Sequence, residues 1–231
     1  MKSFQYYDLV EALRQRGCAV CRLLERDSER FLDMLLYEYV TDSTQQAVFR
    51  ASRGLCAPHS EQMLSLSGYG VGIAVLADTV LWELETIVSQ PLTIDKRLFH
   101  RDAPGAALAD RLEAERQCPC CESLDGSLSR YAEALAEFAR DPALLDAFRA
   151  SDGLCLPHLR AALRQIDKNE DVELLVNIQK AAWGKLRAEL ELYRDKLGER
   201  RRGEAVGAEG DSWQRAVRLL ASTQGVYDEK E

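Results

Sequence analysis

The side chains in this sequence that can do chemistry are seven cysteines and three histidines, and most of them fall into two matching groups. Cys18 and Cys21 form a C-x-x-C pair, and after 34 intervening residues Cys56 and His59 form a C-x-P-H pair. The same order recurs at Cys118, Cys121, Cys155 and His158, with 33 residues between the pairs. In a reducing compartment, paired cysteines near histidines indicate metal binding or redox chemistry rather than structural disulfides.

The two groups belong to an internal repeat. The segments 49–59 and 148–158 are identical at nine of eleven positions at an offset of 99, and the C-x-x-C pairs match at an offset of 100. We therefore expect two homologous units. The predicted boundaries are a first metal-binding repeat at 1–90, a connector at 91–105, a second repeat at 106–202, and a linker with a C-terminal helix at 203–231.

Three thiolates and one imidazole suit a tetrahedral zinc ion with a closed coordination shell. Taking the ligands in chain order, we predict one site within each repeat and two structural Zn²⁺ ions per chain. The first predicted set is Cys18, Cys21, Cys56 and His59. The second predicted set is Cys118, Cys121, Cys155 and His158. An iron–sulfur cluster on the same ligands is the alternative cofactor.

Other interpretations of these residues stay open. The cysteines can be small buried apolar residues, or the C-x-x-C pairs can exchange thiols and disulfides, although neither accounts for the duplicated C-x-P-H. Cys120 has Val20 as its partner in the first repeat, and we interpret it as a packing residue or a weakly exposed thiol. We place His100, which has no cysteine neighbours, on the surface.

The elements that must position these residues are predicted to be helices, because no segment alternates with period two and apolar residues recur at helical spacing. We predict an all-α fold with four helices per repeat and a short C-terminal helix. The predicted ranges are 7–16 and 106–116, 18–39 and 118–140, 43–52 and 142–151, and a fourth helix after each C-x-P-H. In the first repeat the fourth helix is expected to break at 68–72 and to resume as far as 89. In the second repeat it is expected to break near 169 and then to run to 197. The tail helix is expected to span 211–224.

Prolines and glycines indicate where the ligands sit on these helices. Pro58, Pro119 and Pro157 suit the first turn of a helix, so three of the four ligand pairs are expected at helix N-termini, where thiolates are favoured. Gly54 and Gly153 are expected to end helices in the left-handed conformation.

Composition narrows the class of protein. With 46% hydrophobic residues the chain can fold, and no apolar run reaches the length of about 20 residues that crosses a bilayer. The net charge of −8 disfavours a broad nucleic-acid surface. We expect a cytoplasmic location, no membrane or nucleic-acid partner, and a protein partner or a second copy as the binding partner.

The segment 17–25 (G-C-x-x-C-R-L-L-E), the aromatic-rich stretch 31–39 and the segment 52–59 (S-R-G-L-C-x-P-H) resemble an uncharacterised bacterial family of unknown function. The resemblance covers residues 1 to about 200 and implies cysteine and histidine metal binding without an assigned activity. The sequence departs from it at Cys120 and Asp152, and the tail after residue 203 lies outside it.

No phosphate-binding loop, nucleophile elbow or H-E-x-x-H motif is present, and we assign no catalytic residue. The sequence predicts a zinc-binding scaffold or interaction module. The alternative is an iron–sulfur or thiol-redox protein in electron transfer or redox sensing.

Overall fold

The computed structural model describes residues 2–90, 104–198, 200–201 and 203–222. Within these residues the chain forms α-helices and one 3₁₀ helix, and no strand. The first repeat contributes α1 (Phe4–Leu13), α2 (Ala19–Tyr37), α3 (Ser43–Ala51), α4 (Ala57–Ser65) and α5 (Gly70–Ser89). The second contributes α6 (Pro104–Leu112), α7 (Pro119–Glu137), α8 (Pro142–Ala150), α9 (Leu156–Leu163) and α10 (Asn169–Leu197), followed by η1 (Ala208–Asp211) and α11 (Ser212–Ala221).

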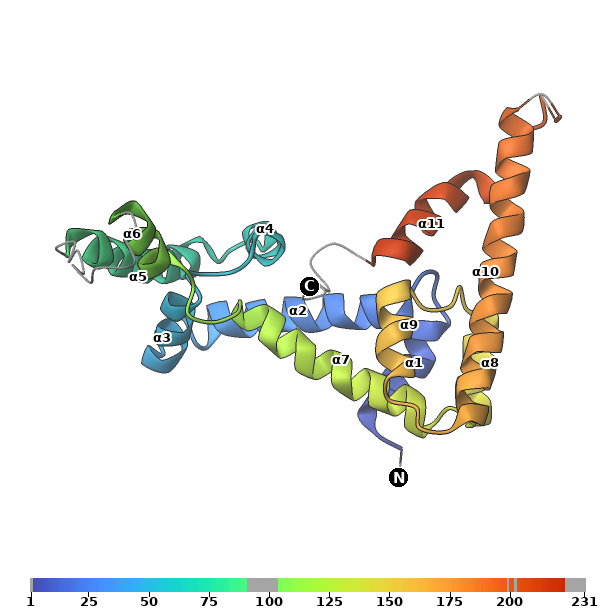
Figure 1. The fold of residues 1–231 in the computed structure, drawn as a ribbon, viewed down its shortest axis with the longest axis horizontal. Helices are drawn as coiled ribbons and strands as arrows, with labels where there is room; N and C mark the ends of the chain where they lie inside the picture. The colour runs from blue at the N-terminus through green and yellow to red at the C-terminus, as the bar shows by residue number, and fades with distance from the viewer. Residues whose placement is uncertain (1, 91–103, 199, 202, 223–231) are drawn as a thin grey trace, which may run out of the picture. The chain divides into compact units, whose positions relative to one another are not determined.

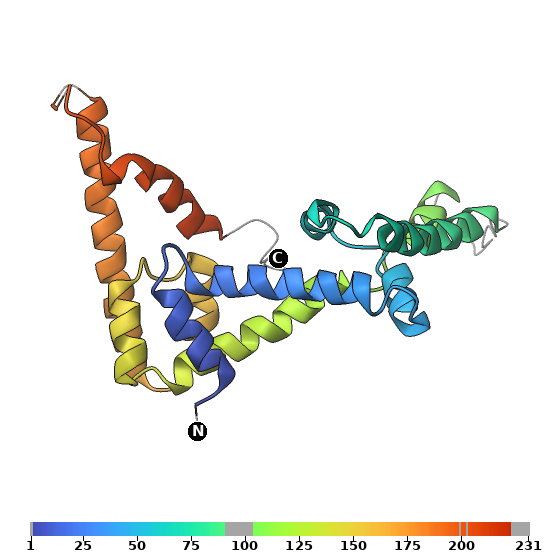
Figure 2. The same cartoon turned by 180° about the vertical axis from the view of Figure 1, so that it is seen from behind.

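The chain divides into two compact units that do not coincide with the two repeats. Unit 1 comprises residues 1–27 and 124–231, and unit 2 comprises residues 28–123. Helices α2 and α7 each start in one unit and end in the other (Figures 1 and 2). Each unit therefore combines segments of both predicted repeats, 1–90 and 106–202.

In unit 1, α1 packs against α8, and α10 packs against both α8 and α11 (Figure 1). Tyr6 joins α1 to the start of α8, since its hydroxyl donates a 2.6 Å hydrogen bond to Asp141. Asp141 also caps α8 by accepting from the backbone N–H groups of Ala143 and Leu144. The core of this unit includes Leu9, Leu13 and Leu154, all of which are fully buried.

In unit 2, α5 packs against α3 and α6. The backbone N–H of Glu115 donates to the carbonyl oxygen of Ala51 at 2.8 Å, which ties the end of α3 to the segment after α6. Leu76 is fully buried on α5, and Phe49 is buried on α3. These two side chains contribute to the core of unit 2.

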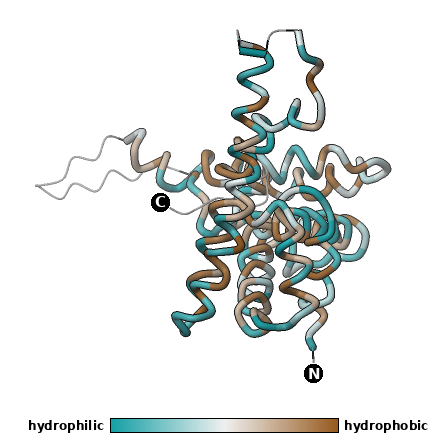
Figure 3. The backbone as a smooth tube through the Cα atoms, turned by 90° about the vertical axis from the view of Figure 1, so that its right-hand side faces the viewer, coloured by the Kyte–Doolittle hydropathy of each residue, from teal (hydrophilic) through white to brown (hydrophobic). Residues whose placement is uncertain are grey.

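The helix predictions are confirmed with small shifts of the ends. The breaks after both C-x-P-H motifs are present, and α10 runs from Asn169 to Leu197 as expected. Gly54 and Gly153 have φ angles of +89° and +81°, although α3 and α8 each end three residues earlier. Hydropathy changes at short intervals along the helices (Figure 3), as amphipathic helices require.

His100 and residues 91–103 of the predicted connector lie outside the described residues. A search of the described helices finds none whose length and apolar character would let it span a bilayer.

Two glycines should respond oppositely to substitution by alanine. At Gly153 a Cβ would lie 2.7 Å from the Nε2 atom of Gln179 and the φ angle is +81°, so Gly153→Ala should lower the free energy of unfolding by at least about 1 kcal/mol. At Gly184, inside α10, a Cβ meets nothing within 4 Å, so Gly184→Ala should raise it by up to about 1 kcal/mol. Urea titrations of both variants measure the change. Equal effects of the two substitutions would contradict this assignment.

Candidate metal centres

Every one of the four ligand pairs stands at the start of a helix. Cys56 and Cys155 occupy the N-cap positions of α4 and α9. Cys18 and Cys118 directly precede the first residues of α2 and α7. Each of these four cysteines accepts, through its carbonyl oxygen, a hydrogen bond from the backbone N–H four residues later. The second ligand of each pair is the third residue of its helix, so both side chains face the same helix end.

This spacing follows from helix geometry. Side chains at the N-cap and third helical positions both reach toward the free N–H groups of the first turn, as in a capping box. Pro58, Pro119 and Pro157 lie in the first turns, as the sequence predicts, since proline needs no N–H partner there. The prediction of three pairs at helix N-termini is therefore confirmed, and Cys18–Cys21 adds a fourth.

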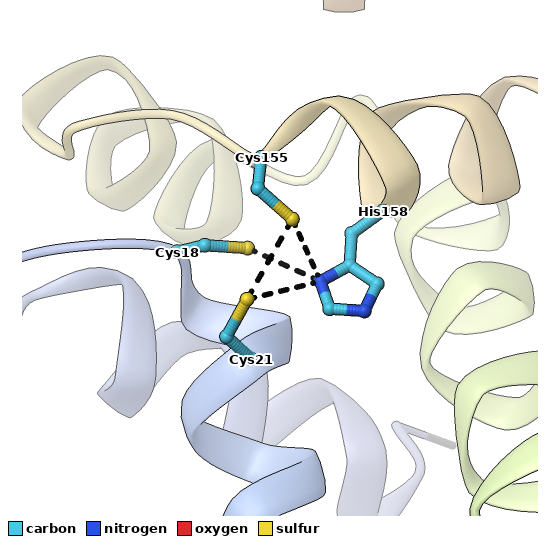
Figure 4. A group of neighbouring side chains, drawn as sticks. All are labelled: Cys18, Cys21, Cys155 and His158. Carbon is cyan, nitrogen blue, oxygen red and sulfur yellow. Dashed lines mark hydrogen bonds between the residues drawn. The ribbon is translucent and has the colours of Figure 1, made fainter. Parts of the chain in front are cut away.

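The first cluster, which we call the unit-1 cluster, consists of Cys18, Cys21, Cys155 and His158. The three sulfur atoms lie 3.5, 3.3 and 3.1 Å from Nδ1 of the imidazole, in chain order. The Sγ atoms of Cys21 and Cys155 are 3.6 Å apart. Figure 4 shows the three sulfurs and this one ring nitrogen pointing at a common centre, while the other ring nitrogen points away.

The second cluster, the unit-2 cluster, consists of Cys56, His59, Cys118 and Cys121. Its sulfur atoms lie 3.2, 3.6 and 3.3 Å from Nδ1 of His59. The Sγ atoms of Cys56 and Cys121 are 3.6 Å apart. In both clusters all four ligand atoms lie within 4.8 Å of one another. The eight residues singled out in the sequence are thus all brought together.

The grouping predicted from chain order is wrong. We expected Cys18 and Cys21 to meet the histidine pair of their own repeat, but they meet Cys155 and His158, and the other two pairs are exchanged in the same way. The physical reason is the length of α2. Its 19 residues carry the chain about 28 Å away from Cys18, and the nine residues of α3 can return at most about 13 Å.

The cluster dimensions fit a single four-coordinate ion. With metal–sulfur bonds of about 2.3 Å and a metal–nitrogen bond of about 2.0 Å, a tetrahedron has edges of about 3.8 Å between sulfurs and about 3.5 Å from sulfur to nitrogen. The observed separations of 3.6 Å and 3.1–3.6 Å match these edges. All seven cysteines are free thiols in the structure. Both clusters can hold a metal ion.

Burial and mutual hydrogen bonding separate the proton affinities of the sulfurs within each cluster. Hydrogen bonds with Cys155 and Cys18 hold the pKa of Cys21 far below its ordinary value, whereas burial raises that of Cys18. In the unit-2 cluster the hydrogen bond between Cys118 and Cys121 acts in opposite directions on its two partners. It lowers the pKa of Cys118 to about 3 and raises the pKa of Cys121. Each cluster therefore stabilises one thiolate before any ion binds.

The imidazole of the unit-1 cluster is also shifted. Burial opposes its charged form, but hydrogen bonds to the sulfurs of Cys155 and Cys21 outweigh burial and raise the pKa of His158 to about 9. An ion that binds through Nδ1 must displace this proton, so ion binding and proton release are coupled.

The two clusters differ in their surroundings. The unit-1 cluster lies under the end of α11, because Ser222 is buried and its hydroxyl lies 3.2 Å from the sulfur of Cys21. In the unit-2 cluster Cys56 and Cys121 are partly exposed. Cys120 is fully buried and burial raises its pKa, and its counterpart Val20 is buried too. Of the two interpretations of Cys120, this geometry favours packing.

The fold and the two clusters define an all-helical protein with two candidate three-cysteine, one-histidine metal centres. The chain belongs to DUF6062, a family of unknown function, whose sequence profile matches residues 67–228. A similar protein is the uncharacterized 23.9 kDa protein in the xynA 3′ region of Caldicellulosiruptor sp. (strain Rt8B.4). It is 24% identical over 218 residues, which cover 94% of this chain and all of that protein. No solved structure gives a significant match.

The resemblance to an uncharacterised family is thereby confirmed, and the similar protein aligns with 94% of this chain, but the family profile also extends past residue 203, where we expected the resemblance to end. The matched region includes the tail up to residue 228 and leaves out the first repeat's motifs before residue 67. It contains one ligand pair from each cluster, Cys118 with Cys121 and Cys155 with His158. The tail belongs with this region because α11 contacts α9 and α10.

Double substitutions distinguish the observed grouping from the grouping in chain order. Cys18→Ser with Cys155→Ser should remove one bound ion, because both sulfurs serve the same centre. Cys18→Ser with Cys56→Ser should remove two, because each sulfur serves a different centre. Elemental analysis of the purified proteins counts the ions. The opposite result would restore the chain-order grouping.

Cys120→Val is the matched control for these variants, because it installs the residue of the first repeat at a buried position outside both clusters. It should leave the metal content unchanged. A lost ion in this variant would make Cys120 a ligand.

Proposed function

We propose that this protein is a zinc-binding helical scaffold whose two structural ions fix four helix starts and so present a surface for a protein partner. The observation that carries the proposal is the gathering of eight ligand atoms into two clusters of tetrahedral size. Three thiolates and an imidazole fill a four-coordinate shell and leave no open position for a substrate. A structural role therefore suits these centres better than a catalytic one.

Cluster size also supports zinc over the iron–sulfur alternative. The cysteines of a multi-iron cluster bind different iron atoms and must stand around the whole cluster. Here the ligand atoms lie within 4.8 Å, which suits one ion. Burial of three of the four unit-1 ligands further disfavours thiol–disulfide exchange, since an attacking thiolate needs access.

The energetic weight of such ions is large. Binding of structural zinc can contribute on the order of 10 kcal/mol, comparable to the whole stability of a domain. The net charge of each loaded centre is −1, and the positive ends of two helices face it. The short α4 and α9 helices, nine and eight residues long, are too short to be stable alone and gain most from this attachment.

Exposed apolar residues support a protein partner. On α5 the side chains of Val71, Leu81 and Trp82 are 82%, 59% and 62% exposed, although this helix is largely apolar. Apolar surface of this kind on a folded protein is typical of interaction sites. A second copy of the chain is the alternative partner. We place the protein in the cytoplasm, where free thiols persist.

Purification without added metal tests the identity of the ions. The protein should be colourless and contain about two zinc ions per chain by elemental analysis. Removal of zinc by a strong chelator should lower the melting temperature by ten degrees or more, on the order expected for the loss of several kcal/mol, and added zinc should restore it. A brown protein that contains iron and sulfide would refute the zinc assignment.

Acid should release the ions. Zinc displaces protons from the thiols and from His158, whose pKa lies at about 9 without an ion, so affinity must fall as pH falls. Zinc release to a colorimetric chelator should therefore increase from about pH 8 to about pH 5. The affinity should decrease about tenfold per pH unit for each proton displaced. Retention of zinc that is independent of pH in this range would show that the thiolates are not the ligands.

A further inference from the structure

A cavity of about 550 Å³ lies within unit 1, against the exposed side of the unit-1 cluster. Cys18 and Cys21 form part of its wall, and the remainder comes from α2, the loops before α2 and α9, α10, η1 and α11. This volume is within the range of small-molecule sites. The closed coordination shell leaves the ion unavailable to a ligand, so whatever occupies the cavity must be held by its other side chains.

The charges on the cavity wall are unevenly paired. Five cationic side chains and four carboxylates line it: Arg16, Arg22, Lys185, Arg215 and Arg218, and Glu25, Asp152, Glu189 and Asp211. Arg215 pairs with Glu189 and Asp211, and Arg16 lies 3.5 Å from Asp211. The carboxylate of Asp152 accepts a 2.8 Å hydrogen bond from the backbone N–H of Gly17.

Three cations remain without a carboxylate among the described residues. Lys185 on α10 and Arg218 on α11 are exposed and have no ion-pair partner there. Arg22 uses one guanidinium nitrogen to donate to the backbone carbonyl of Arg16, and its buried Nε has no hydrogen-bond partner. With four carboxylates and a loaded centre of charge −1 the lining as a whole is close to neutral, so an anionic occupant is favoured locally, by the three cations that have no carboxylate partner.

The second repeat supplies an internal comparison. At the offset of 100, Arg16 and Arg22 correspond to Arg116 and Glu122. Arg116 and Glu122 form a 2.7 Å ion pair, so the equivalent charge beside the unit-2 cluster is neutralised within the chain. Beside the unit-1 cluster both positions are arginine and this compensation is missing. The repeats therefore differ in this ion pair, and it is missing beside the cluster that borders the cavity.

The wall also has an apolar part, formed by Ala182, Leu186 and Leu219. We infer that the cavity binds a small organic oxyanion, a molecule with a phosphate or carboxylate head and an apolar body. Arg22, Lys185 and Arg218 bind the head group, and the three apolar side chains contact the body. This inference goes beyond the structural role proposed for the ions and does not depend on which metal they are.

Calorimetric titration of the metal-loaded full chain tests the inference, with phenyl phosphate and benzoate as separate probes at constant ionic strength in chloride. At least one probe should bind with one site per chain, and the tighter probe identifies the head group. Lys185→Gln with Arg218→Gln should weaken its binding at least tenfold. Arg22→Glu, which installs the residue of the second repeat, should do the same.

The matched control is Lys180→Gln with Arg187→Gln, which removes the same charge from α10 at positions that do not line the cavity. It should bind the probe within about twofold of the unaltered protein, because only contacts in the cavity should matter. Metal content is measured in every sample, so loss of the ion site is distinguished from loss of the oxyanion site. The inference is overturned if neither probe binds, or if the control weakens binding as much as the cavity variants do.

Discussion

A four-coordinate ion requires its ligand atoms within one coordination sphere, and each candidate centre of this protein takes two such atoms from each of two helix starts. The N-cap and third helical positions serve this geometry because both side chains face the free N–H groups of the first turn. The same N–H groups and the positive helix end stabilise the thiolates. This stabilisation allows Cys155 and His158 at the start of α9 to be almost fully buried, even though Cys155 is a charged thiolate when it binds an ion.

Much of this could be predicted from the sequence because the signals are local. Proline after the first cysteine of a pair, as at Pro157, indicates a first helical turn whatever the helix later packs against. A glycine after a predicted helix, such as Gly153, likewise indicates a positive φ angle from local sequence alone. The duplicated spacing then identified the eight ligand residues. None of these inferences needs knowledge of which segments meet in space.

The grouping of the ligands depends on distances through space, and chain order misled us there. The length of α2 was the available signal, because a helix predicted over 18–39 separates the C-x-x-C from the C-x-P-H of its own repeat. The oxyanion cavity could not be predicted, since its wall combines Arg22, Lys185 and Arg218 from three distant segments. The tail illustrates the same limit. Helix α11 contacts α9 and α10, yet Trp213 and Val217 on it remain 48% and 60% exposed, so the amphipathic pattern did not indicate which side of this helix packs.

The exchange of ligand pairs makes the two repeats depend on each other. A single repeat contains one ligand pair of each centre and completes neither. A chain with only the first repeat would therefore need a second copy to fill a coordination shell, and two such copies could form the same two centres between them. Covalent linkage of the repeats makes this pairing intramolecular and so independent of protein concentration. It also lets the surroundings diverge, as Arg22 and Glu122 have. One centre borders a cavity with unpaired cations, while Arg116 beside the other is neutralised by its ion pair with Glu122.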